Sequence, residues 1–341
     1  MEPVAFALVG YGAWGSHHAR VLAEGPHTRL AAIAEQSEAS LAAAQAAHPQ
    51  ALVVADYREL LARPEIEAVD VVLPSHLHHE VGSAALQAGK HLLLEKPMAL
   101  TIAACQDLVE LARRNDRQLA VGHEFRYSSL WGQVKTLVDA GAIGDPQYAL
   151  IELWRNPYRL GSDGWRYDIR RVGNWILEEP IHFFDLARWY FGKWGEPVSV
   201  FARANARNAE RPKLQDNFSA LVEFPEGRYA VISQTLSAFE HHQVAKLTGT
   251  HGALWANWSG AMDRTFQPSF YLKHFDGQQV TEVSIPQASG EVYELANEIA
   301  GLAAAIRGGP PPRASGVDGQ WSVAMCLKAQ ESVDTGSVVR F

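Results

Sequence analysis

Short apolar runs alternate with amphipathic segments over roughly the first third of the chain. The run 68–73 is rich in β-branched residues, as in a parallel strand that is covered on both faces, and the segments between the runs place apolar residues at helical spacing. The alternation predicts a doubly wound parallel sheet with helices on both faces, which is a Rossmann domain. Its expected strands are residues 4–9, 30–34, 51–54, 68–73, 91–94 and 118–122.

From about His123 the pattern changes to alternating apolar and polar positions, which is typical of strands with one wetter face. The expected strands are residues 147–154, 198–206, 218–224, 229–236, 244–248 and 254–258. Helices are expected at 129–140, 180–191, 291–307 and about 318–335. We therefore expect an α/β protein whose C-terminal α+β domain, residues 123–341, carries a large, mainly antiparallel open sheet and follows a Rossmann domain of residues 1–122.

Length, charge and cysteine content support this interpretation. A chain of 341 residues exceeds the size at which one core usually divides. A net charge of -8 argues against nucleic-acid binding and against a basic membrane patch, and no apolar run is long enough for a membrane helix. Only two cysteines are present, too few for a zinc dehydrogenase site, and no signal peptide is visible, so we expect a cytoplasmic protein.

A glycine motif joins the first strand to the first helix. Gly10-x-Gly12-x-x-Gly15 follows the apolar run directly. The first glycine permits a tight turn, the second lets the backbone approach phosphates without a Cβ in the way, and the third lets helix and strand pack closely. The helix N-terminus adds free N–H groups and a positive dipole end for a pyrophosphate.

An acidic residue at the end of the second strand makes the glycine motif more specific. Glu35 follows the run at 30–34, where a carboxylate accepts hydrogen bonds from the adenosine ribose hydroxyls. This charge would repel the extra phosphate of NADP, and no Arg or Lys follows nearby to offset it. The sequence therefore predicts NAD as the cofactor.

The strand at 91–94 delivers Glu95-Lys96-Pro97 at its carboxyl end, where ligands collect in doubly wound sheets. With this tripeptide and the glycine motif, the chain resembles the glucose-fructose oxidoreductase / inositol dehydrogenase / rhizopine-catabolism (Gfo/Idh/MocA) family. Further matches are Pro74 and His78 in the turn after the fourth strand, the segments 122–127 and 141–146, the segment 173–192, and the segment 316–319. Three residues depart from the family pattern, since His76 stands where Asn is usual, Asn174 replaces a glycine and Glu178 replaces an Asp.

The resemblance implies a sugar or cyclitol oxidoreductase whose open sheet covers the nicotinamide cleft on one side and builds a subunit interface on the other. A homodimer or homotetramer is therefore expected. The cofactor-binding residues predicted from the motifs are Gly10, Gly12, Ala13, Trp14, Gly15, Glu35, Pro74, His78, Glu95, Lys96 and Pro97.

Oxidation of a secondary hydroxyl needs a group that takes the proton and a positive group that supports the oxygen. Lys96 fits the second role. The family places Asp and His four residues apart in its catalytic helix, and here Glu178 stands four residues before His182. His182 is the predicted proton-transfer residue and Glu178 its helper or a substrate ligand, although Pro180 suggests that the helix begins after Glu178. The alternative is that His182 is a core histidine bonded to Asp185.

The segment 154–171 combines aromatic rings with five arginines, at positions 155, 159, 166, 170 and 171. Rings pack against sugar C–H surfaces, and arginine forks bind anions, so the segment is consistent with a sugar or polyol that carries an anionic group. Equally, these arginines would pair with Glu178, Glu179, Asp163 and Asp168, or cross to another subunit. The predicted substrate-binding residues are Lys96, Arg155, Trp165, Arg166, Glu178, Glu179 and His182.

No metal site is expected. The 14 histidines include neighbours at 76, 78 and 79 and a pair at 241–242, but no His-Glu-x-x-His or Cys-x-x-Cys accompanies them. Two alternatives to the dehydrogenase remain open. One is an NAD-dependent glycosidase that oxidises its sugar transiently and releases the leaving group by elimination, with Glu178 or Glu179 as an added acid or base. The other is a non-catalytic nucleotide-binding protein, which would need neither Lys96 nor His182.

Overall fold

The structure, a computed structural model, describes residues 2–341 and divides into two compact units. The first unit holds the residues up to His123 together with Leu295–Gln320, and the second holds Glu124–Glu294 with Trp321–Phe341. The division expected after residue 122 assigns residues 295–320 to the second domain, whereas the structure groups them with the first. The reason is an amphipathic helix whose apolar side chains complete the core of the first unit.

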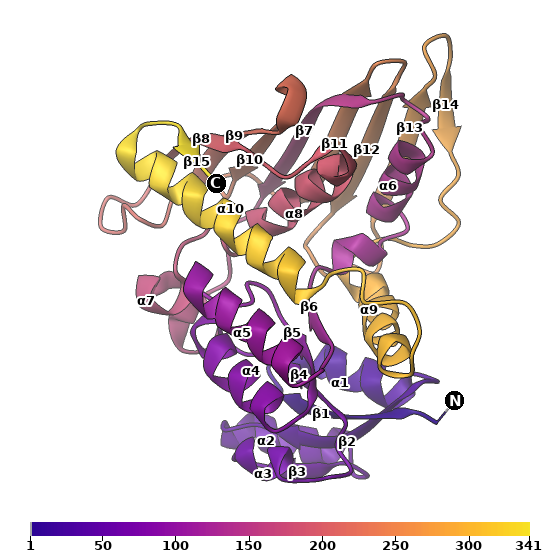
Figure 1. The fold of residues 1–341 in the computed structure, drawn as a ribbon. Helices are drawn as coiled ribbons and strands as arrows, with labels where there is room; N and C mark the ends of the chain where they lie inside the picture. Colours follow the sequence, from indigo (N-terminus) through magenta and orange to yellow (C-terminus); the bar gives the residue numbers. More distant parts are fainter. Residues whose placement is uncertain (1) are drawn as a thin grey trace. The chain divides into compact units, whose positions relative to one another are not determined.

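Within the described residues the first unit contains one six-stranded parallel sheet, in the order β3-β2-β1-β4-β5-β6 (Figure 1). This order is that of a Rossmann fold and confirms the predicted fold class. The strands are β1 (Val4–Val9), β2 (Thr28–Ala34), β3 (Leu52–Val54), β4 (Ala68–Val71), β5 (His91–Leu94) and β6 (Leu119–Val121).

Helices cover this sheet because each presents an apolar stripe to it. Phe6 and Leu8 of β1 belong to one buried cluster with Leu22 of α1 and with Leu295 and Ile299 of α9 (Glu291–Ile306). The other segments are α1 (Gly15–Glu24), α2 (Glu38–Ala47), α3 (Arg58–Leu61), η1 (Ser75–Leu77), α4 (His78–Gln87) and α5 (Ile102–Arg114). Ser37 caps α2 and Thr101 caps α5, as both side chains accept a hydrogen bond from the backbone N–H three residues later.

The second unit, over the described residues, is built on a nine-stranded sheet in the order β14-β13-β12-β11-β7-β10-β9-β8-β15. All its neighbours but one pair are antiparallel, which confirms the predicted mainly antiparallel sheet. The strands are β7 (Pro146–Arg155), β8 (Ser199–Asn205), β9 (Asn217–Glu223), β10 (Tyr229–Thr235), β11 (His241–Gly249), β12 (Ala253–Gly260), β13 (Ser269–Phe275), β14 (Val280–Val283) and β15 (Val339–Arg340).

The expectation of a simple antiparallel meander is wrong at the centre of this sheet. β7 lies between β11 and β10 and runs parallel to β10. The two strands are separated in sequence by a long excursion that includes α8 (Pro180–Phe191), and a crossover of this length permits parallel pairing. The strands β13, β14 and β15 were not expected from the sequence, because β14 and β15 are short and mostly exposed and β13 keeps few buried positions.

Helix α8 contacts β7 and β10, and α6 (Trp131–Asp139) contacts β12, so the helices cover one face of the sheet (Figure 1). Nearly every side chain of α8 is buried, including Phe183, Phe184 and Tyr190. The remaining segments of this unit are η2 (Glu124–Tyr127), η3 (Ser162–Tyr167), α7 (Ile169–Val172), η4 (Gly192–Trp194), η5 (Pro225–Gly227) and most of α10 (Gly316–Thr335).

Candidate active site

The three glycines of the turn between β1 and α1 differ in how much space a side chain would have. Gly10 has a φ of 100°, and a Cβ there would lie 2.2 Å from the Val72 carbonyl oxygen. A Cβ on Gly15 would lie 2.0 Å from the Gly10 carbonyl oxygen, so no side chain fits where the helix starts. Around Gly12, by contrast, the space is open within 4 Å. This cradle fits a bound pyrophosphate, which would approach at Gly12 and at the N-terminus of α1.

Glu35 lies beside this turn, as the predicted cofactor site requires. Its Oε2 accepts the Tyr11 backbone N–H at 2.7 Å, and its Oε1 accepts the Ser37 N–H at 2.8 Å. Two backbone donors thus fix the carboxylate, while an ionised carboxylate has about four acceptor positions in all. The residues fit NAD, with Glu35 left able to accept from ribose hydroxyls. Ala13 is exposed in the same turn and Trp14 is half-buried.

The turn after β5 carries Glu95-Lys96-Pro97, with a cis peptide bond between Lys96 and Pro97. The buried Glu95 carboxylate accepts the Trp14 indole N–H at 2.8 Å and the Lys96 backbone N–H at 3.2 Å. The Lys96 side chain is half-buried. Two of the predicted cofactor residues, Trp14 and Glu95, are therefore hydrogen-bonded to each other although they lie 81 positions apart in sequence.

His78 is buried rather than exposed to a ligand. Its Nδ1 lies 2.7 Å from the Pro97 carbonyl oxygen, and its Nε2 lies 2.8 Å from that of Leu73. The ring therefore joins the turn that contains Pro74 to the turn that contains Lys96. This geometry favours a role for His78 in positioning the two turns.

In the second unit, His182 lies in the first turn of α8 and is 2 % exposed. Its ring stacks on Phe125 with a centroid separation of 4.7 Å, and its Nε2 lies 3.7 Å from Glu124 Oε1. Asp185, the partner that the core-histidine alternative assigned to His182, bonds through both carboxylate oxygens to Arg126, each at 2.8 Å. A buried imidazole near a carboxylate is suited to proton exchange.

Glu124 was missed as a partner of His182, although it belongs to the segment 122–127 that carries part of the family resemblance. The two residues are 58 positions apart in sequence, and only the packing of η2 on α8 brings them together. The sequence signal was present, because Glu124 lies two positions after the end of the strand predicted at 118–122.

Glu178 lies in the turn before α8, which begins at Pro180 as expected from the position of the proline. The buried Glu178 carboxylate accepts from Arg166 Nε at 2.6 Å. Glu178 and His182 therefore do not share a helical face, and Glu178 is bound to the arginine segment instead.

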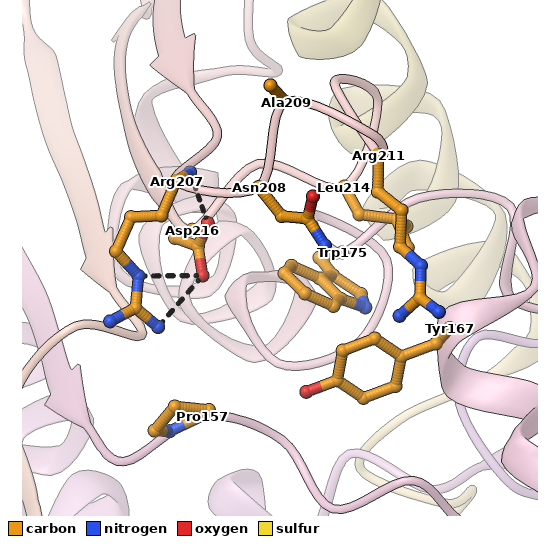
Figure 2. Close-up of a pocket in the computed structure, with 9 residues that line it drawn as sticks. All are labelled: Pro157, Tyr167, Trp175, Arg207, Asn208, Ala209, Arg211, Leu214 and Asp216. Atoms are coloured by element: carbon orange, nitrogen blue, oxygen red, sulfur yellow. Dashed lines mark hydrogen bonds and ion pairs between the residues drawn. The ribbon is translucent and has the colours of Figure 1, made fainter.

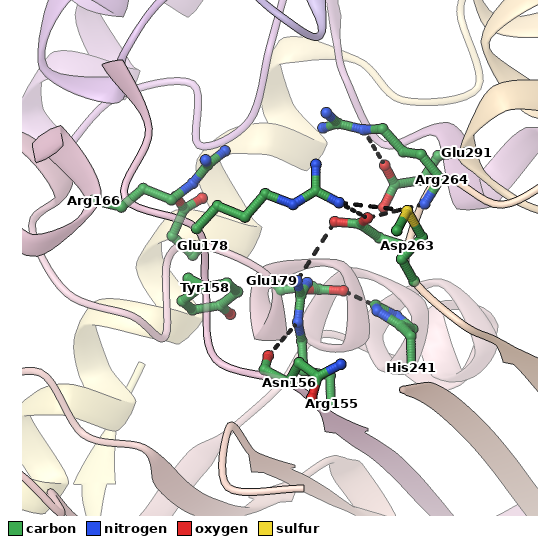
Figure 3. A network of polar contacts seen from close by, with 12 residues as sticks. Arg155, Asn156, Tyr158, Arg166, Glu178, Glu179, His241, Asp263, Arg264 and Glu291 are labelled. Atoms are coloured by element: carbon green, nitrogen blue, oxygen red, sulfur yellow. Dashed lines mark hydrogen bonds and ion pairs between the residues drawn. The ribbon is translucent and has the colours of Figure 1, made fainter. Parts of the chain in front are cut away.

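Glu179 anchors a second network, which Figure 3 shows. It pairs with the buried guanidinium of Arg155, and its Oε1 lies 3.2 Å from His241 Nε2. Arg155 also lies 3.5 Å from Asp263, which in turn lies 3.5 Å from Arg159. Burial raises the pKa of the Asp263 carboxyl, but the charges of Arg155 and Arg264 outweigh it and hold that pKa below its ordinary value. Burial lowers the pKa of His241, so its ring is neutral near pH 7.

The arginines of segment 154–171 are thus matched with acceptors of the same chain. Arg170 bonds to the Asp168 carboxylate and Arg171 to the Asp163 carbonyl oxygen, in addition to the pairs of Arg155, Arg159 and Arg166. The pairs of Arg155, Arg166 and Arg170 are those that the pairing alternative predicted, whereas Arg159 pairs with Asp263 and Arg171 contacts only a carbonyl oxygen. The arrangement disfavours an anion site built from these arginines. Trp165 is 9 % exposed and lies under the Arg166 guanidinium, 4.8 Å from ring centroid to Cζ.

A cavity of about 430 Å³ adjoins this segment in the second unit (Figure 2). Tyr167 and Trp175 form an edge-to-face pair on one side, and Arg207, paired with Asp216, lies on another. The further lining residues are Pro157, Asn208, Ala209, Arg211 and Leu214. Most of these residues were missed, because they come from the loop between β8 and β9, whose proximity to the arginine segment appears only in the folded chain.

Lys96 belongs to the first unit and His182, Glu178 and Glu179 to the second. In the two histidine groups noted in the sequence, His79 bonds to Asp107 and His242 to Ser259. No helix among residues 2–341 is both long enough and apolar enough to span a membrane.

Comparisons with known proteins identify the family. Residues 4–123 match the oxidoreductase family with an NAD-binding Rossmann fold, and residues 131–255 match the GFO/IDH/MocA C-terminal domain. Inositol 2-dehydrogenase of Rhizobium meliloti is 27% identical over 97% of both chains. The 1,5-anhydro-D-fructose reductase of Ensifer adhaerens is 27% identical over 83% of this chain and 82% of its own.

The fold also agrees with solved structures. An inositol dehydrogenase homolog from Azotobacter vinelandii, complexed with NAD+, superposes with a TM-score of 0.84 at 20% identity, over 100% of this chain and 98% of that one. The strand order, the glycine cradle and both family matches agree. The chain belongs to the Gfo/Idh/MocA family of NAD-binding oxidoreductases.

Proposed function

We propose that this protein transfers hydride between NAD and a secondary hydroxyl or ketone of a neutral sugar or cyclitol. Two curated relatives, an inositol 2-dehydrogenase and a 1,5-anhydro-D-fructose reductase, support the substrate class by their names. The observation that carries the proposal is the buried His182 beside Glu124, in a chain that also holds Lys96 in a turn next to the glycine cradle.

The chain's residues would divide the chemistry as follows. NAD, when bound, supplies the hydride acceptor. Lys96 holds the substrate oxygen and stabilises its negative charge, and His182 takes the hydroxyl proton or returns it. Glu178, with its carboxylate fixed by Arg166, accepts a hydrogen bond from a further hydroxyl.

The preference for a neutral substrate follows from the arginine pairs. Arg155 and Arg166, which would otherwise bind a carboxylate or phosphate, each hold a buried glutamate. A substrate anion would have to displace one of these carboxylates and leave it buried and unpaired, which is unfavourable.

The experiment is the absorbance of reduced nicotinamide with purified protein, NAD and a panel of neutral and anionic sugars and cyclitols, with their glycosides. A sustained rise with a neutral compound, abolished in Lys96→Ala and His182→Ala, is the expected result. A flat trace on the whole panel, with free sugar released from a glycoside, would favour the NAD-dependent glycosidase instead. A flat trace with no release would favour a non-catalytic nucleotide-binding protein.

We also propose that two or four copies associate through the open face of the nine-stranded sheet. One row of side chains crosses this face through paired positions and includes Phe201, Leu221, Val231, Leu150 and Trp255, with Lys246 between the last two. Trp255 is 51% exposed and Leu221 37%. An apolar row of this kind on a sheet is typical of an interface.

Sedimentation velocity tests the assembly. Leu221→Lys and Trp255→Glu together should convert the dimer or tetramer to a monomer, while a monomeric wild type would contradict the proposal.

We also propose a cytoplasmic location, because Cys105 and Cys326 are both buried free thiols, as is usual in a reducing compartment.

A further inference from the structure

A cluster of buried charges in the first unit is used by none of the roles proposed above. His18 on α1 and Asp70 on β4 are both 0% exposed. His18 Nδ1 lies 2.8 Å from Asp70 Oδ2, and His18 Nε2 lies 3.3 Å from Glu95 Oε1. A single imidazole ring therefore bridges two carboxylates that come from different strands of the parallel sheet.

The two carboxylates that face the ring favour its protonated form. Burial lowers the pKa of His18, but the charge and hydrogen bond of Asp70 and the nearby Glu95 carboxylate outweigh burial and raise it to about 10. Nδ1 is hydrogen-bonded to Asp70, whereas Nε2 faces Glu95 at ion-pair distance without hydrogen-bond geometry. A buried charge is tolerated when it is paired and hydrogen-bonded, and this arrangement meets both conditions.

Glu95 connects this cluster to the cofactor turn. The same carboxylate that faces His18 accepts the Trp14 indole N–H and the Lys96 backbone N–H. The Trp14 ring also packs edge-to-face on His18, with a centroid separation of 5.2 Å. A Cβ on Gly122 would lie 3.0 Å from the Glu95 carboxyl carbon, so the absence of a side chain at Gly122 leaves room for the carboxylate.

We propose that His18, held by Asp70, is a positioning residue for NAD, because it fixes Glu95 and thereby the Trp14 end of the glycine turn. Trp14 directly precedes Gly15, where α1 begins, so its placement sets the backbone N–H groups that face the pyrophosphate. If the His18 ring were uncharged, Glu95 would still accept the Trp14 and Lys96 N–H groups but would have no buried cation beside it. The inference depends on NAD as the cofactor and is independent of the substrate and of the roles given to Lys96 and His182.

Equilibrium binding of NADH to substrate-free protein, followed by nicotinamide fluorescence, tests the proposal without any turnover. His18→Gln keeps one hydrogen-bonding side chain and removes the cation, and we expect the Kd for NADH to rise about tenfold, the effect of one lost charge-assisted contact. The matched control is His79→Gln, which removes an exposed imidazole 2.8 Å from Asp107 in the same unit and should leave the Kd unchanged.

Trp14→Phe covers the case in which His18→Gln does not fold. It keeps an aromatic ring, smaller than indole, beside His18 and removes the N–H that Glu95 accepts. We expect this variant to weaken NADH binding severalfold with an unchanged melting temperature. Unchanged NADH affinity in Trp14→Phe would overturn the proposal, as would unchanged affinity in a folded His18→Gln.

A pH profile separates positioning from simple packing. Asp70 and Glu95 are the charged groups that act on His18, and Lys96 acts on Glu95 in turn. Asp70→Asn removes the charge that raises the pKa of His18 most, so that pKa falls and the ring loses its proton within the neutral range. NADH binding by this variant should weaken between about pH 6 and 9, while binding by the wild type stays level there because its His18 stays protonated. Parallel pH profiles for the two proteins would contradict the inference.

Discussion

At the scale of single residues, the second unit is marked by buried charges that occur as matched pairs. Arg126 with Asp185 and Arg155 with Glu179 each place a guanidinium against a carboxylate away from water, and the partly exposed Arg166 pairs with the buried Glu178. Such pairs contribute little net stability over apolar residues of the same size, but the loss of one partner leaves a costly buried charge. Substitution of one partner should therefore act on local geometry as well as on stability.

The role of Lys96 leads to the first prediction. Lys96→Met keeps the length of the side chain and removes the charge that stabilises the substrate oxygen. We expect kcat/KM to fall by about 10²–10³, the effect of one lost electrostatic contact at a developing negative charge. The measurement is steady-state NADH formation, with Lys328→Met, which loses a surface pair with Glu331, as the control. A drop of less than about threefold would exclude a direct role for Lys96.

A variant of Arg166 distinguishes an arginine that only pairs with Glu178 from one that binds an anionic group of the substrate. Because Arg166 holds Glu178, Arg166→Gln should lower turnover of neutral and anionic substrates by the same factor, on the order of tenfold for a misplaced site residue. The ratio of kcat/KM values for a neutral sugar and its acid measures this directly. A selective loss on the acid would show that Arg166 contacts the anion.

At the scale of elements, the strand–turn–helix at the start of the chain makes a steric prediction. Gly15→Ala would place a Cβ 2.0 Å from the Gly10 carbonyl oxygen, and we expect a loss of about 1–3 kcal/mol in the free energy of unfolding. Gly12→Ala meets no atom within 4 Å, so the protein should keep its stability but bind NADH at least about tenfold more weakly. Thermal unfolding and NADH titration of both variants check the contrast, and equal behaviour would contradict it.

The start of α9 gives a pH-dependent prediction. Glu294 is buried, accepts from Ser289 Oγ at 2.8 Å and from the Gly290 N–H at 2.9 Å, and burial raises its pKa to about 7. Because the folded-state pKa is the higher one, the stabilisation is fully present below the ordinary value of 4.5 and is lost as pH rises to about 7. The loss amounts to about 3 kcal/mol.

Urea unfolding at acid and alkaline pH measures this effect. Glu294→Gln should remove the part of the pH dependence that lies between about pH 4.5 and 7, whereas the exposed control Glu331→Gln should keep it. An unchanged pH dependence in Glu294→Gln would show that another group causes it.

At the scale of the whole molecule, the sequence predicts the local features and misses the long-range ones. The glycine turn, Glu35 and the beginning of α8 at Pro180 depend on neighbours in sequence, and the structure shows each at the expected place. The parallel pairing of β7 with β10 and the return of residues 295–320 to the first unit depend on tertiary contacts, which no local pattern records.

In the candidate site, too, the sequence predicts the contacts between near neighbours and misses the long-range ones. The predicted pairs of Arg166 and Arg170 are confirmed because these opposite charges lie within one short stretch of sequence, whereas the distant partner of Arg159, Asp263, was not predicted. His182 contacts Glu124, which lies 58 positions away in sequence. His18 contacts Asp70, which lies 52 positions away, and also joins Asp70 to Glu95. Only the packing of several elements brings these residues together.

The central claim is that hydride passes between the substrate carbon and the nicotinamide. The most direct measurement uses a neutral cyclitol or sugar that carries deuterium on the reacting carbinol carbon, with mass spectrometry of the NADH formed. The account predicts NADH that is one mass unit heavier than the unlabelled coenzyme, and no such product with His182→Ala. Product without label in the accumulated NADH, or product with no net NADH, would contradict it.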